Sequence, residues 1–284
     1  MAVYKRTYSG YTGPRTAPWS HFRVPARYAY ARLMRSKFLL IFIAVCMFYP
    51  LGSLTYIYVA HNLRFIALLG VRGIAPVDGR FFYIFSVIQG TFAYLLTAFI
   101  SPSLVTPDMV NGALPLFFCR PFSRTEYVAS KFAVLLPVLS IVTWIPGLVL
   151  FSIQASLEGW DWTRSNYWLA AGLFAGLVVW IISISLIGLS LSALVKRKIA
   201  AGALILGIFF AGAGFGSAIN NVMRTSSGTV IDLAQDMHAI WSDLLRYDAG
   251  IDMPVTTAWL AIGLTWIICL LLLNRRIRAF EVVK

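Results

Sequence analysis

Charged residues are scarce in this chain of 284 residues, of which only 12% are Asp, Glu, Lys or Arg and 59% are hydrophobic. A soluble domain needs more charge than this to cover its surface, so the composition predicts a polytopic membrane protein. A helix needs roughly 20 apolar residues to cross the hydrocarbon core of a bilayer. We therefore expect an all-α fold with six transmembrane helices, at Phe38–Ala60, Phe81–Ser101, Phe132–Ala155, Tyr167–Val195, Ile199–Ile219 and Val255–Leu273.

Ionisable residues are missing from the interiors of these six segments. Proton-coupled carriers usually place such groups at mid-membrane depth, so the lack of ionisable residues there argues against proton coupling. Sodium-coupled carriers can use backbone carbonyls instead, which leaves a secondary carrier open. The sequence also lacks a G-x-x-x-x-G-K-[ST] phosphate loop, and no connector is long enough for a nucleotide-binding domain. Energy for uphill transport is therefore expected to come from a partner protein.

Cysteine and histidine are also few, with three of each and no metal-ligand spacing between them. We read the cysteines as small buried apolar groups. The acidic residues between the last two spans form a string: Asp232, Asp236, Asp243, Asp248 and Asp252. The apolar residues of 229–249 recur at helical spacing, which predicts an amphipathic helix on the outer membrane face or against the spans, with its aspartates on a solvated side. Catalytic or metal-binding use of these aspartates is the alternative, and an enzyme is not expected.

The net charge of +13 follows the predicted topology. An even number of spans places both termini on one side, and 18 of the 24 Lys and Arg residues fall on that side. The positive-inside rule then predicts a multi-pass membrane protein with both termini in the cytoplasm. We expect its location to be the plasma (inner) membrane. Such basic flanks contact anionic lipid head groups. Nucleic-acid binding is not expected.

Three regions follow from this topology. Residues 1–37 form a cytoplasmic N-terminal segment in which 26–37 are read as an interfacial helix, or as ordinary basic flanking residues. Because the first apolar run starts at Phe38 and has full span length, no cleavable leader is expected. Residues 38–273 form the six-span transmembrane domain, and 274–284 form a basic cytoplasmic tail.

The connector between spans two and three, residues 106–131, combines an apolar patch with fixed charges. Asp108 and Asn111 follow Pro107, which favours a helix start there. A short helix with exposed Phe117 and Phe118 beside arginines is typical of a helix that binds in the groove of a partner. The alternative is that these aromatics enter the membrane interface while the arginines only fix topology.

The run from Asp108 to Lys131 resembles the connector of the type-2 ABC export permeases. That family pattern has an acidic residue four before a glycine, a leucine-rich stretch, Arg-Pro, a small residue before Arg, and a closing lysine. The matching positions here are Asp108, Gly112, Leu114, Arg120, Pro121, Ser123, Arg124 and Lys131. The six-span layout, the N-terminal helix, the outer helix before the last span and the basic tail are similar to the family as well. Pro115 and Met109 depart from it, since acidic and arginine residues are common there.

The resemblance implies the permease subunit of an ATP-driven exporter. The connector would be a coupling helix whose Asp108, Gly112, Leu114, Phe117, Phe118, Arg120, Pro121, Arg124 and Lys131 form the contact with a separate ATP-binding cassette subunit. That partner would bind ATP and Mg²⁺, leaving no cofactor in this chain. A second permease copy or homologue would complete the pathway. The alternative function is a structural or anchoring membrane subunit that transports nothing.

Polar and small residues inside the spans allow two further readings. Ser183, Ser185, Ser190 and Ser192 of the fourth span would bond backbone carbonyls or join helices, with substrate contact as the alternative. Gly212 and Gly216 have the small-xxx-small spacing of close helix packing. We expect that spacing to serve packing inside the molecule, with dimer packing or a backbone bend as the alternatives.

Overall fold

The computed structural model describes residues 21–62, 75–118, 123–224, 227–251 and 253–277. Within these ranges every regular element is a helix, and six stretches are long and apolar enough to cross a membrane. The predicted all-α fold with six spans is thereby confirmed. The spans are α2 (Lys37–Ala60), α4 (Gly79–Val110), α6 with α7 (Arg124–Val142 and Trp144–Glu158), α8 (Trp160–Leu194), α9 (Lys198–Met223) and α11 (Val255–Arg276).

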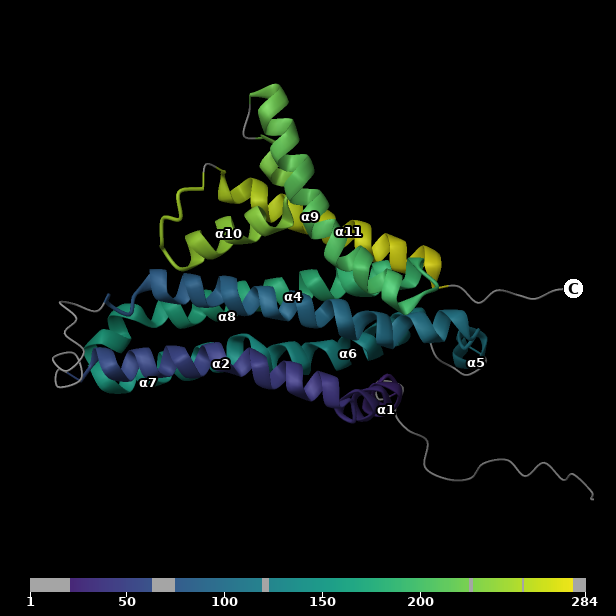
Figure 1. Cartoon of the computed structure of the whole chain (residues 1–284), viewed down its shortest axis with the longest axis horizontal. Coiled ribbons are helices and arrows are strands. Elements are labelled where there is room, and N and C mark those ends of the chain that lie inside the picture. Colours follow the sequence, from purple (N-terminus) through teal and green to yellow (C-terminus); the bar gives the residue numbers. More distant parts are fainter. Residues whose placement is uncertain (1–20, 63–74, 119–122, 225–226, 252, 278–284) are drawn as a thin grey trace, which may run out of the picture.

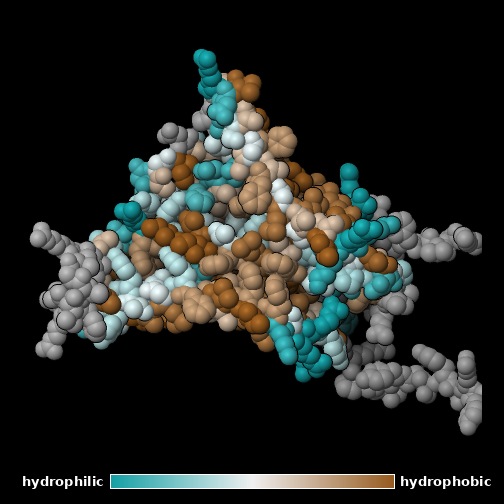
Figure 2. All heavy atoms as spheres, viewed as in Figure 1, coloured by the Kyte–Doolittle hydropathy of each residue, from teal (hydrophilic) through white to brown (hydrophobic). Residues whose placement is uncertain are grey.

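The spans α2, α4, α6–α7 and α8 run along the long axis of the molecule, and α9 diverges steeply from them (Figure 1). Most of α4 and α8 is buried, whereas most of α2, α9 and α11 is not, so α4 and α8 form the centre of the bundle. Helices α1 (Arg23–Met34) and α5 (Leu114–Phe118) lie at one end, which we call the connector end. The opposite, distal end holds the start of α4 and the α7–α8 turn. Figure 2 shows a broad apolar surface across the middle of the molecule.

Helix α4 is longer than its sequence predicts. It continues through Pro102 and Pro107 to Val110, so the expected helix start after Pro107 is wrong. A proline lacks an N–H and leaves the carbonyl four residues earlier without its helical donor. For Pro107 that carbonyl belongs to Ser103, and the Arg32 side chain of α1 donates to it at 3.3 Å. This replacement donor explains why the helix need not end at the proline.

The same compensation occurs in the middle of the bundle around the buried Gln89 of α4. Its side-chain amide donates to the carbonyl of Cys46 in α2 at 3.2 Å and to that of Val142 in α6 at 2.9 Å. Four residues after these carbonyls stand Pro50 and Pro146, which cannot donate. One glutamine therefore satisfies two carbonyls that two prolines leave open. The third span also breaks here, between α6 and α7 at Thr143.

The predicted outer helix exists as a short 3-10 turn (Ser227–Ile231) followed by α10 (Leu233–Leu244). Helix α10 packs against α4, α8, α9 and α11, so it is covered on more than one side. The expectation of a solvated acidic side is accordingly only partly right. Asp243 and Asp248 are exposed, but Asp232 and Asp236 are buried. Asp252 lies outside the described residues.

The small and hydroxyl-bearing residues of the spans serve internal packing. A Cβ added to Gly216 would lie 2.7 Å from the carbonyl oxygen of Gly228, so this glycine lets the 3-10 turn approach α9. Ser183, Ser190 and Ser192 donate to carbonyls of their own helix, and Trp266 of α11 donates to the Ser183 hydroxyl at 2.9 Å. These contacts agree with the packing interpretation for three of the four serines and for Gly216, whereas the buried Ser185 hydroxyl has no hydrogen-bond partner among the described residues.

Candidate functional site

The connector begins where α4 ends in a glycine-stabilised turn. The N–H of Ala113 donates to the carbonyl of Asp108 at 3.0 Å, which is the hydrogen bond of a Schellman C-cap. Gly112 stands between them with φ +62°, in the left-handed region that glycine adopts without steric cost. The glycine of the connector pattern therefore has a backbone role, and it turns the chain from α4 toward α5.

Span three begins with a capping box that the sequence interpretation missed. The N–H of Ser123 donates to the Glu126 carboxylate at 2.6 Å, and the N–H of Glu126 donates back to the Ser123 hydroxyl at 3.2 Å. The signal was present as S-x-x-E, the usual capping-box pattern. This box fixes where α6 starts. Arg124 is the first residue of α6, and its side chain is exposed. The capping box therefore fixes the backbone position from which this side chain extends.

A buried ion pair joins the two ends of the connector. The Lys131 ammonium in α6 lies 2.5 Å from the Asp108 carboxylate in α4, with the two side chains 7% and 16% exposed. The Tyr127 hydroxyl donates to the same carboxylate at 2.9 Å. These three side chains form what we call the connector brace. Removing Asp108 or Lys131 alone would leave the other charge buried and unpaired, which is far costlier than losing an exposed pair.

The brace reaches α5 through an aromatic contact. The rings of Phe117 and Tyr127 meet edge to face with centroids 5.7 Å apart. Leu114, at the start of α5, is 5% exposed and belongs to the core. Leu114 and Phe117 thus anchor α5 to the rest of the protein. Tyr127 was absent from the sequence-predicted site because a single tyrosine at the end of a connector carries no distinguishing pattern.

The residues predicted to contact the cassette subunit differ in how far they are exposed. Asp108 and Lys131 bond to each other, Leu114 is buried, and Phe117 is half-buried, while Gly112 and Arg124 are exposed. Pro115 is exposed on the first turn of α5, and Met109 packs against the core. Arg120 and Pro121 lie outside the described residues, as does the side chain of Phe118. The structure therefore separates side chains that position the connector from those that a partner can touch.

Helix α1 lies beside the brace. It packs against α6, and its Arg32 bonds the Ser103 carbonyl of α4 at 3.3 Å. The N-terminal helix, the end of α4 and the start of α6 are consequently one connected unit at the connector end.

The distal acidic residues form a different environment. Asp232 caps α10 by accepting from the N–H of Ala234 at 3.0 Å. Asp236 is 2% exposed, and one of its carboxylate oxygens has no hydrogen-bond partner among the described residues. Burial, with a smaller contribution from the Asp232 charge, raises the pKa of Asp236 to about 8. Burial lowers the pKa of the neighbouring His238, which lies 2.8 Å from the Tyr83 hydroxyl.

Metal ions need a set of ligand side chains that lie close together. No group of three or more His, Cys, Asp or Glu side chains within the described ranges is placed to hold a metal ion. The two cysteines in those ranges, Cys46 and Cys269, are free and buried. The connector remains the site where sequence pattern and geometry coincide. The sequence matches no protein-family model and no curated protein.

Proposed function

We propose that the chain is the membrane-spanning permease subunit of an ATP-driven exporter, and that a separate ATP-binding cassette subunit docks at the connector end. The observation that carries the proposal is the connector brace. A short helix between two long spans is held at its base by a buried ion pair and an aromatic contact. Such a helix can pass a push from a partner to both spans instead of yielding locally.

The proposed mechanism moves α4 and α6 together. A cassette subunit that closes on ATP pushes against α5, and the Asp108–Lys131 pair keeps the two span ends at a fixed separation. Because α1 is bonded to α4 through Arg32, it follows the same motion. This is a rigid-body change between two states that nucleotide biases. The partner holds ATP and Mg²⁺, and a second copy of the chain or a related permease completes the pathway.

Two further features support an external source of energy and this orientation. In the described spans, Asp, Glu, Lys, Arg and His occur only within about the first eight or the last three residues of a span, which argues against a proton path of the chain's own. The excess of Lys and Arg falls on the termini and the connector. By the positive-inside rule this charge bias supports a connector end in the cytoplasm, and the membrane we propose is the plasma (inner) membrane.

The test is co-purification with a cassette ATPase. Arg124→Glu reverses an exposed charge, and a glutamate suits the first turn of α6 through the helix dipole, so the fold should persist. We expect this variant to weaken cassette binding at least about tenfold, as expected for a central interface arginine. Arg164→Glu reverses an exposed arginine at the distal end and is the matched control.

The outcomes separate the candidate functions. If no ATPase accompanies the native protein, or if both charge reversals act alike, the exporter proposal is wrong. If an ATPase binds but no cargo stimulates its hydrolysis in vesicles holding the complete complex, the anchoring subunit is favoured instead.

A further inference from the structure

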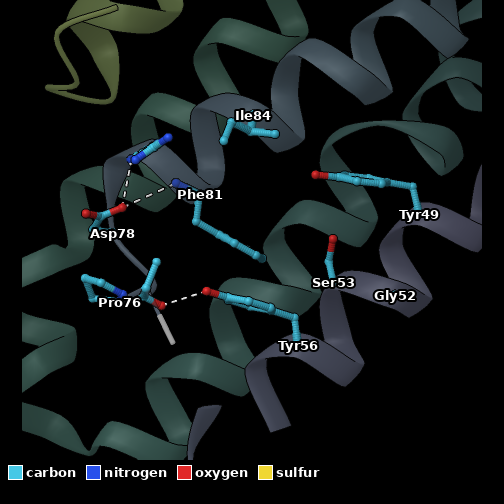
Figure 3. Close-up of a pocket in the computed structure, with 10 residues that line it drawn as sticks. Tyr49, Gly52, Ser53, Tyr56, Pro76, Asp78, Phe81 and Ile84 are labelled. Carbon is cyan, nitrogen blue, oxygen red and sulfur yellow. Dashed lines mark hydrogen bonds between the residues drawn. The ribbon is translucent and has the colours of Figure 1, made fainter. Parts of the chain in front are cut away.

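A cleft lies between α2 and the start of α4 at the distal end, far from the connector. Its volume is about 480 Å³, within the range of roughly 300–1,000 Å³ that is usual for small-molecule sites. Figure 3 shows the hydroxyls of Tyr49 and Ser53 pointing toward the same space as Phe81 and Ile84. We call this space the α2–α4 cleft.

The walls of the cleft are fixed by contacts within the protein. The rings of Tyr56 and Phe81 stack with centroids 5.8 Å apart and planes 16° apart. The Tyr56 hydroxyl also donates to the carbonyl of Ala75 at 2.8 Å, which holds the segment before α4 against α2. On the α2 side, no atom of the described part of the chain lies within 4 Å of the position that a Cβ on Gly52 would occupy. The cleft is therefore preformed, and Gly52 keeps it open.

Polarity changes along the cleft from apolar to charged. Phe81 and Ile84 line it toward the middle of the membrane helix, while Asp78 and Arg80 line it where α4 begins. One Asp78 oxygen accepts from the N–H groups of Arg80 and Phe81, so this residue is the helix N-cap. Asp78 and Arg80 are both exposed, and within the described residues neither forms an ion pair. Among the described residues, the mouth of the cleft thus presents the Arg80 guanidinium and the Asp78 carboxylate without an ion-pair partner.

We propose that the α2–α4 cleft binds one zwitterionic phospholipid. The phosphate pairs with the Arg80 guanidinium, the ammonium group pairs with the Asp78 carboxylate, and an acyl chain lies along Phe81 and Ile84. Both helices of the cleft are membrane spans, so the bilayer itself supplies such a molecule. A headgroup with only negative charge would meet Asp78 unfavourably. The inference requires only that α2 and α4 span a membrane, and it is independent of the proposed export function.

The charge requirement is tested by native mass spectrometry of the full chain in detergent. Dioleoyl phosphatidylethanolamine and dioleoyl phosphatidylglycerol are titrated separately, and the affinity for the first bound lipid is measured. We expect the wild type to prefer the ethanolamine lipid about tenfold, the effect of one charge-assisted hydrogen bond. Asp78→Asn keeps a good helix cap but removes the charge, so it should abolish the preference. Arg80→Gln should weaken the binding of both lipids.

The position of the site is tested by filling it. Gly52→Phe places a ring in the open space and should abolish binding of the first ethanolamine lipid. Gly263→Phe in α11 is the matched control, since nothing lies within 4 Å of its Cβ position either. Equal affinity of the wild type for the two lipids, preference for phosphatidylglycerol, or unchanged binding by Gly52→Phe would each overturn the proposal. Because Asp78→Asn alters one charge only, it keeps the test decisive even if the Gly52 variant folds poorly.

Discussion

Single side chains at helix interruptions hold much of this bundle together. Four prolines lie inside the long helices α2, α4 and α6, at positions 50, 102, 107 and 137, and Pro146 follows in α7. In lipid a carbonyl that loses its helical donor has no water to replace it. Gln89 and Arg32 replace the donor for three such carbonyls. The prolines were visible in the sequence, but their partners lie in other helices and could not be predicted from it.

Replacing Gln89 with methionine should destabilise the protein by about 1–3 kcal/mol, since two interhelical hydrogen bonds are lost and two buried carbonyls stay unpaired. Gln154→Met is the matched control, because the side-chain amide of Gln154 donates only to Glu158 of its own helix, at 3.4 Å. Thermal unfolding in detergent measures both. Equal losses of stability in the two variants would show that the hydrogen bonds of Gln89 to α2 and α6 contribute no more than a bond within one helix.

Asp236 should make stability depend on pH in an unusual direction. Its pKa rises from an ordinary 3.8 to about 8 in the fold, so between these values the folded state binds more protons than the unfolded state. The contribution of this pKa shift to the free energy of unfolding is then fully present below about pH 4, and it is lost as the pH rises through 8. Asp232 opposes ionisation of Asp236, and the neighbouring His238, with its lowered pKa, supplies little positive charge to favour it.

The variant Asp236→Asn should remove this loss, and at pH 8 its free energy of unfolding should exceed that of the wild type by up to about 6 kcal/mol, since the pKa shift spans roughly four units at ~1.4 kcal/mol each. Asp243→Asn changes an exposed carboxylate of the same helix and should leave the profile unchanged. The measurement is unfolding temperature at pH 5 to 8.5. A parallel profile for wild type and Asp236→Asn would contradict the burial of a protonated carboxyl.

At the scale of elements, the connector behaves as one unit because its two ends are tied. We expect Lys131→Met to cost about 3–5 kcal/mol, since it leaves the Asp108 carboxylate buried without its cation. The double change Asp108→Leu with Lys131→Met should cost less than Lys131→Met alone, because no unpaired charge remains. Lys198→Met removes an exposed lysine at the same end of the molecule and is the control.

A double-mutant cycle on unfolding free energy measures this coupling, and hydrogen exchange of the α5 amides reports whether the brace holds the connector. We expect faster exchange in α5 for the single variant than for Lys198→Met. Additive losses at Asp108 and Lys131 would mean that the two residues act separately, and the brace would be refuted.

Elements were predictable to the extent that their signals are local. The apolar runs gave six spans, and the apolar patch after Gly112 indicated the short helix that the structure has as α5. The start of α6 was also encoded locally, in Ser123 and Glu126. The pairing of Asp108 with Lys131 and the contacts of Gln89 with α2 and α6 join residues that are distant in sequence. Such contacts leave no pattern within a single segment.

At the scale of the whole molecule, hydropathy gave the number of spans but not their arrangement. Apolar residues surround every span, so composition does not mark the buried face. Close approach of α4 and α8 depends instead on glycines: a Cβ on Gly188 would lie 2.5 Å from the Ser101 hydroxyl. The burial of α10, and with it of Asp236, follows from the packing of several helices around it. A sequence reading of one helix at a time could not anticipate that.

The sidedness of the molecule is the last prediction, and the export proposal depends on it. Thr125 and Ser165 are exposed hydroxyl residues near the starts of α6 and α8, at the connector and distal ends. Each is replaced by cysteine in a Cys119→Ser background, where Cys46 and Cys269 are buried. In intact cells a membrane-impermeant maleimide should label Ser165→Cys and spare Thr125→Cys until the membrane is permeabilised. Because six spans separate the ends strictly, labelling of Thr125→Cys from outside would place the connector beyond the reach of any cytoplasmic ATPase.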